Sequence, residues 1–272
     1  MKIRQLILFR MRPLCLIVTL SLFFLVCSAC QSSTKSSVNE VINTPTNPSP
    51  SESVASVKPN ADSTNNVPLS KQIEYKAVQD KVPTAKISSS DVIKTPITKN
   101  VGGVTYFVFS KKSDKENYYL GAQVGSTVWD YGIIGYGQKE NLDLIQFKSI
   151  HLGNNKEMLK IAGACGSACP VAIYFNILGP QPNAIIRLEK FTEESDIDKD
   201  GVIEIIANVG MPHNTEIYKL KDSQVLSTNL NELLGAANVE YDNQKNSFIV
   251  TFPGSNEQYE YMIDNDKIKI KK

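Results

Sequence analysis

The chain has 272 residues, with 29 Lys and Arg against 28 Asp and Glu, so its formal net charge is +1. Four of those basic residues fall within the first twelve positions, and removal of that region leaves a net charge of about −3. The composition therefore gives no basic patch and argues against nucleic-acid binding. The length allows one or two domains.

The N-terminus has the order of a secretory signal peptide. Basic residues at positions 2–12 precede an apolar run over 14–26, which gives way to small residues just before Cys30. A membrane-spanning helix needs about 20 apolar residues, and this run is shorter. We expect residues 1–29 to be the signal peptide, with an ordinary cleaved signal and a retained anchor as the alternatives.

The residues around Cys30 resemble the lipobox of bacterial lipoproteins. Ser28 and Ala29 supply the small residues that precede the acceptor, whereas Cys27 stands where the motif usually has Leu. The resemblance implies that Cys30 is lipidated, for instance with palmitate, and becomes the new N-terminus. Stable anchoring needs more than one acyl chain, which a diacylated or triacylated cysteine provides. The expected location is the extracytoplasmic side of a cell membrane, whether inner or outer.

The segment that follows has the composition of a tether. Residues 31–68 are dominated by Ser, Thr, Asn and Pro and contain no aromatic residue, and residues 69–100 contain one aromatic and no glycine. Such a stretch cannot bury enough apolar surface to offset the entropy lost on ordering. We therefore predict a lipid-anchored disordered linker over residues 30–100, with an end-to-end distance of about 45 Å.

The folded part is predicted to be a β-rich extracytoplasmic domain over residues 101–272. All 15 glycines lie between Gly102 and Gly254. The segments 104–109 and 203–209 have the β-branched, aromatic and alternating character of strands. Helical periodicity is scarce, and one short helix is predicted over residues 228–234, ending at Gly235.

Three parts of this domain share one order of elements. Apolar strands at 158–162, 203–209 and 248–252 each follow a polar turn and precede a glycine-bearing turn and a tyrosine-bearing strand. The spacing of about 43–47 residues is that of a four-stranded propeller blade. The fold class predicted is mainly β: an antiparallel sheet, a sandwich or a partial propeller-like array.

Residues 196–204 form the sharpest chemical motif, Asp-x-Asp-x-Asp-Gly-x-x-Glu. Carboxylates at alternate positions converge when such a loop curls, and hard cations prefer all-oxygen shells. An EF-hand would need a Glu where the chain has Ala207, and residues 203–207 indicate a strand instead of a helix. The alternative is a solvated acidic turn between two strands.

The loop and the strand after it are similar to the calcium loops of FG-GAP/VCBS repeats. The resemblance covers residues 196–207 closely and extends only loosely to the partner turns. It implies a structural calcium ion held by the carboxylates of four residues and one backbone carbonyl: Asp196, Asp198, Asp200, Glu204 and the carbonyl of Val202.

Two cysteines remain in the predicted domain, Cys165 and Cys169. Outside the cytoplasm such a pair favours a disulfide, and the turn between them must fold back to close it. Free thiols and a redox or metal site are the alternatives, although the three-residue spacer differs from the two-residue spacer of thioredoxin-like motifs.

No catalytic fingerprint accompanies these features. The chain has two histidines far apart in sequence and lacks a nucleophile elbow, a Walker loop and a dinucleotide motif. We expect a membrane-anchored envelope lipoprotein whose β domain has a non-enzymatic binding or scaffolding role, with a protein or an envelope polymer as partner. An envelope hydrolase acting on wall or surface polymers and a solute-binding lipoprotein are the alternatives.

Overall fold

The computed structural model describes residues 67–79, 81–136, 139–164, 166 and 169–271. The predicted signal peptide, Cys30 and the linker up to residue 66 lie outside the described residues. Among the residues that are described, no helix is long and apolar enough to cross a membrane.

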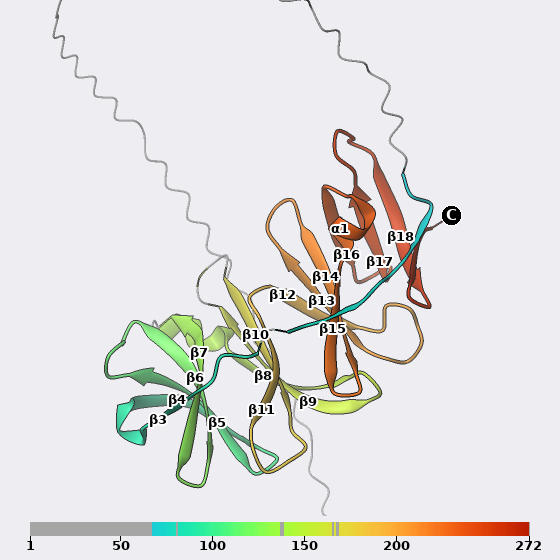
Figure 1. The fold of residues 1–272 in the computed structure, drawn as a ribbon. Helices are drawn as coiled ribbons and strands as arrows, with labels where there is room; N and C mark the ends of the chain where they lie inside the picture. The colour runs from blue at the N-terminus through green and yellow to red at the C-terminus, as the bar shows by residue number, and fades with distance from the viewer. Residues whose placement is uncertain (1–66, 80, 137–138, 165, 167–168, 272) are drawn as a thin grey trace, which may run out of the picture. The chain divides into compact units, whose positions relative to one another are not determined.

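Four antiparallel sheets follow one another along the chain, each built from four consecutive strands (Figure 1). The first sheet contains β4 (Val92–Val101), β5 (Val104–Lys111), β6 (Asn117–Val124) and β7 (Thr127–Tyr136). The second contains β8 (Gln146–Leu152), β9 (Lys156–Ala164), β10 (Pro170–Asn176) and β11 (Asn183–Leu188). The third contains β12 (Phe191–Ser195), β13 (Glu204–Val209), β14 (Asn214–Lys221) and β15 (Gln224–Asn229). The fourth contains β16 (Asn238–Asp242), β17 (Ser247–Thr251), β18 (Gln258–Asp264) and β19 (Lys267–Ile270).

Helical structure within the described ranges is limited to short segments, so the mainly β prediction is confirmed. They are η1 (Ser89–Asp91), η2 (Lys139–Leu144) and α1 (Leu230–Leu234). The predicted short helix corresponds to α1, although its cap is Asn229, whose side chain accepts from the backbone N–H of Glu232. Gly235 ends the helix in the left-handed conformation, with φ at 70°.

Each sheet packs face to face on the next sheet in the chain. Because side chains alternate between the faces of a strand, β10 directs Ile173 and Phe175 into a core shared with the first sheet. Its Ala172 and Tyr174 enter a second core shared with the third sheet. A third core joins the third and fourth sheets and includes Ile206. Among the predicted architectures, this arrangement corresponds to the propeller-like array.

The three repeated segments occupy equivalent places in this array. They fall in β9, β13 and β17, each of which is the second strand of its sheet. The first sheet has the same second strand, β5, which the sequence predicted as a strand over 104–109 but not as a fourth copy of the repeated order. The turn before β5 is Gly102–Gly103, whereas the other copies have Asn- or Asp-bearing turns.

The N-terminal segment, residues 69–87, corrects the predicted boundary at residue 100. Within it, β1 (Ser70–Gln72) pairs with β19, β2 (Lys76–Ala77) with β15, and β3 (Ala85–Ile87) with β7 (cyan in Figure 1). Strand β4 also precedes the predicted boundary and opens the first sheet. A sheet edge offers backbone donors and acceptors to any extended chain, so the polar composition of this segment gave no sign of its strands.

Close packing of the first two sheets depends on Gly163 in β9. A Cβ at this position would overlap the backbone carbonyl oxygen of Ile134 in β7. We expect Gly163→Ala to lower the free energy of unfolding by about 3 kcal/mol, because two backbones must separate. Chemical denaturation measures this loss. Gly135→Ala is the matched control, since its Cβ would meet a side-chain methyl of Ile145 at 3.3 Å, and a cost of about 1 kcal/mol is expected. Equal losses in the two variants would contradict the prediction.

Candidate functional site

The acidic loop joins β12 to β13. Two residues adopt positive φ to curl it, Lys199 at 64° and Gly201 at 84°. The aspartates then accept hydrogen bonds from the backbone of the loop itself. Oδ2 of Asp196 accepts from Gly201 N at 3.0 Å, and Oδ1 of Asp198 accepts from Asp200 N at 3.3 Å. The loop is therefore held by its own carboxylates.

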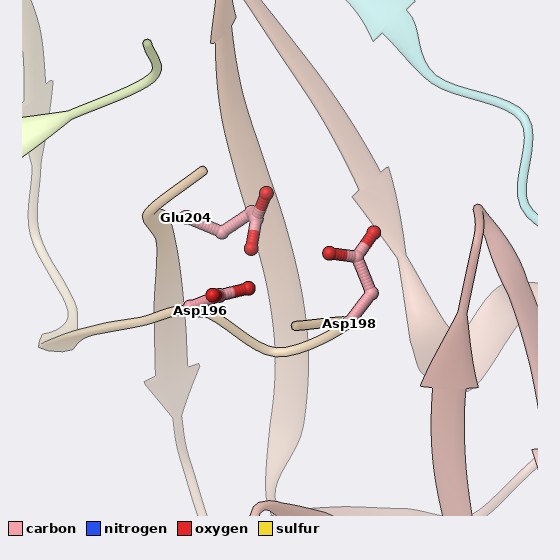
Figure 2. Close-up of side chains that lie close together, drawn as sticks. All are labelled: Asp196, Asp198 and Glu204. Carbon is pink, nitrogen blue, oxygen red and sulfur yellow. The ribbon is translucent and has the colours of Figure 1, made fainter. Parts of the chain in front are cut away.

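Three of its carboxylates converge, as Figure 2 shows. One oxygen each from Asp196, Asp198 and Glu204 lies within 4.8 Å of the others. The Glu204 residue is 0% exposed. Oδ1 of Asp196 and Oε1 of Glu204 are buried and accept no hydrogen bond. Buried carboxylate oxygens without donors are costly unless a cation compensates them.

Lys219 on β14 brings a positive charge to this cluster. Its Nζ lies 3.2 Å from Oδ2 of Asp198, 3.5 Å from Oε1 of Glu204 and 2.8 Å from Oδ1 of Asp266. The geometry to Glu204 is that of an ion pair without a hydrogen bond. Because Asp266 belongs to the turn between β18 and β19, Lys219 links the third sheet to the fourth.

Sequence reasoning missed Lys219, although a signal for it exists. In the antiparallel pairing of β13 with β14, Ile205 lies opposite Tyr218, so Lys219 follows on the same face as Glu204. The sequence predicts strands on both sides of the turn at 210–214, so a lysine on the second strand was a candidate to face Glu204. The register that places Lys219 opposite Glu204 comes from the structure.

Burial dominates the electrostatics of the cluster. It raises the pKa of Glu204 to about 7, even though the Lys219 ammonium and the Ile197 N–H act in the opposite direction. Burial alone would lower the pKa of Lys219, but the hydrogen bond to Asp266 and the surrounding negative charges raise it above its ordinary value. Lys219 therefore stays charged, while Glu204 titrates near neutral pH.

Tyr75, from the N-terminal segment, covers one side of the cluster. The Lys219 nitrogen lies 5.4 Å from the centre of its ring, within cation–π range. Its hydroxyl is buried without a hydrogen-bond partner, and burial raises its pKa above the ordinary value. The segment predicted to be linker thus helps to shield the lysine from water.

The predicted calcium ligands divide into two groups. Asp196, Asp198 and Glu204 lie together. The carboxylate of Asp200 accepts from Val202 N at 2.7 Å and is outside the group of three found among the described residues. The carbonyl of Val202 stays a prediction as a ligand.

Only one of the two cysteines of the predicted disulfide, Cys169, lies among the described residues. Cys169, just before β10, is disulfide-bonded. Cys165 lies outside the described residues, as do the three cysteines of the N-terminal region. The pairing of Cys165 with Cys169 therefore stays a prediction.

A second charged cluster lies between the second and third sheets. Nζ of Lys160 is 2.6 Å from Oε1 of Glu194, and that oxygen also accepts from the Tyr174 hydroxyl at 2.7 Å. The two residues help to line a groove of about 610 Å³ beside β12. Burial and the charge of Glu194 raise the pKa of Tyr174, so its phenol stays protonated. The cluster therefore pairs the carboxylate of Glu194 with an ammonium and a phenol.

Comparison with known proteins gave no match to a protein-family model, to a curated protein or to a solved structure.

The raised pKa of Glu204 makes stability depend on pH in calcium-free protein. Its ordinary value is 4.5 and its folded value about 7, so the folded state binds the proton more tightly across this window. Stability contributed by this group is complete below pH 4.5 and falls as the pH rises to about 7. We expect Glu204→Gln to remove this dependence, measured as the free energy of unfolding against pH in a chelator.

The control for this measurement is Glu240→Gln, which changes an exposed residue of β16. It should retain the pH profile of the unsubstituted chain. A Glu204→Gln profile parallel to that of the unsubstituted chain would contradict the prediction.

Proposed function

We propose that this chain is a lipid-anchored protein of a bacterial cell envelope whose β domain has a binding or scaffolding role and is stabilised by calcium. The observation that carries the proposal is the convergence of Asp196, Asp198 and Glu204, with two buried carboxylate oxygens that accept no hydrogen bond. The anchor is supported by the lipobox-like sequence that ends at Cys30.

The geometry of the three carboxylates suits a calcium ion. Calcium binds oxygen at about 2.4 Å, so any two oxygens that share one ion lie at most about 4.8 Å apart, and the three carboxylate oxygens lie within 4.8 Å of one another. The three carboxylates would hold the ion, and Asp200 and the carbonyl of Val202 are the further ligands implied by the FG-GAP/VCBS resemblance. Bound calcium would compete with the ammonium of Lys219, which keeps Asp266 as a partner at 2.8 Å.

The position of the site supports a structural role for the ion. The loop enters β13, and Ile197 within it and Ile206 in β13 belong to the core between the third and fourth sheets. Backbone O of Asp196 accepts from the side chain of Asn246, in the turn between β16 and β17 of the fourth sheet, at 3.0 Å. A cation that fixes this loop would therefore also fix the contact between two sheets.

Calcium should stabilise the full chain against heat. At free calcium about one hundred times the Kd, the gain is about 2.7 kcal/mol, or a rise in Tm of roughly 5–10 °C for a domain of this size. Asp198→Ala should abolish the gain, because it removes one of the three converging carboxylates. Scanning calorimetry with calcium and with a chelator measures both.

The matched control is Asp143→Ala, which changes an exposed aspartate of η2. It should keep the full calcium response. No stabilisation of the unsubstituted chain, or an equal response in Asp198→Ala, would remove calcium from the proposed function.

Lipidation at Cys30 predicts that the chain expressed in bacteria incorporates an alkyne-labelled fatty acid and fractionates with membranes. Cys30→Ser should lose the label and leave the membrane fraction, because it removes the acceptor thiol. Cys27→Ser is the matched control and should retain both properties. Label that persists in Cys30→Ser would contradict the anchor.

A further inference from the structure

The last strands of the four sheets differ in whether a further strand pairs with them. The last strand of each sheet is β7, β11, β15 or β19, and each is the edge of its four-strand unit. The N-terminal segment adds β3 to β7, β2 to β15 and β1 to β19. Among the described strands, β11 alone of these four pairs on one side only, with β10.

The N-terminal segment passes β11 without pairing to it. After β2 the backbone N–H of Val78 still donates to the carbonyl of Val225 in the third sheet, at 2.9 Å. Further along, Pro83 has no N–H to donate. The segment and β11 are separated by a groove of about 470 Å³.

Apolar and basic side chains line this groove. The apolar ones come from both walls: Val78 and Val82 from the segment, and Ile186 and Leu188 from β11. Its charged residues are three basic and one acidic, namely Lys81, Arg187, Lys190 and Glu189. Arg187 pairs with Glu189 at 3.3 Å, and Lys190 pairs with Glu216 at 2.6 Å. The open backbone edge therefore lies beside apolar surface, and the exposed Lys81 supplies the remaining positive charge.

We propose that the open edge of β11 binds an extended segment of a partner protein, with apolar and acidic side chains in alternation, as a fifth strand of the second sheet. The three covered edges show that each of the other three sheets accepts an added edge strand in antiparallel pairing. Backbone hydrogen bonds supply affinity in this mode of recognition, and alternate side chains supply specificity.

Charge decides between two kinds of occupant. A second copy of this chain, paired edge to edge through β11, would bring a second Lys81 to the same edge without adding a carboxylate to pair with it. Like charges across paired strands are destabilising. An acidic segment meets the same residues with opposite charge, so the groove favours a different protein as partner.

The inference rests on the proposed binding role and gives it a location away from the acidic loop. Its test therefore reads peptide binding, whereas the calcium test reads stability. Failure of peptide binding would leave calcium stabilisation unaffected, and failure of calcium stabilisation would leave peptide binding unaffected. The two failures are therefore distinguishable.

The experiment uses the full chain in detergent and a fluorescein-labelled octapeptide of alternating valine and glutamate. Fluorescence anisotropy should show saturable binding. The same peptide with alternate backbone amides N-methylated cannot donate to the edge and should not bind. Lys81→Glu should weaken binding roughly three- to five-fold, as expected for one exposed ion pair lost.

Lys112→Glu is the matched control, since it reverses an exposed charge in the turn between β5 and β6. It should leave the affinity unchanged. Absence of saturable binding would identify β11 as an edge merely protected by the lysines and the proline beside it, Lys81, Lys190 and Pro83, and would overturn the proposal. Undiminished binding of the methylated peptide, or equal affinities of the two lysine variants, would overturn it as well. If the chain dimerises and the peptide disrupts the dimer, a second copy of this chain occupies the edge, and the proposed partner protein is rejected.

Discussion

The second and third sheets are each packed on both faces, and this double burial sets the side chains that their strands can carry. A strand in the second or third sheet must direct apolar side chains to both neighbours, as Ala172, Ile173 and Tyr174 do in β10. Each face contributes roughly 25 cal/mol per Å² of apolar surface removed from water. Tight approach then requires small residues where backbones meet, which places Gly163 against the carbonyl of Ile134.

The same packing determines the electrostatics of the acidic loop. Glu204 and Ile206 lie on one face of β13, and that face is covered by the fourth sheet. Glu204 is therefore buried where an unpaired carboxylate is costly, and its environment must supply positive charge. Lys219 supplies one charge from the adjacent strand, and calcium is the second source that we propose. Competition between the two cations would connect calcium binding to the contact between the third and fourth sheets.

Stacking buries the faces of the sheets but leaves unpaired backbone groups at their edge strands. The N-terminal segment supplies hydrogen-bond partners for three of these edges. It pairs with three outer edges in turn. In doing so it brings Ile73 into the core of the third and fourth sheets and places the Tyr75 ring 5.4 Å from the ammonium of Lys219. In the proposed lipoprotein, the segment that follows the anchored Cys30 leads directly into these edge strands. The edge of β11 is the one at which we propose that a partner protein adds a further strand.

Features encoded in local chemistry could be predicted from the chain alone. Alternation and β-branching predicted the mainly β class, and the spacing of the acidic residues predicted a curled loop with converging carboxylates. The structure brings Asp196, Asp198 and Glu204 together and leaves Asp200 outside that group. The remaining features depend on contacts between distant parts of the chain. Residues 69–100 form strands because neighbouring edges offer them backbone partners, which composition does not record. Lys219 reaches Glu204 through strand register and Asp266 through sheet packing, and both depend on residues distant in the chain.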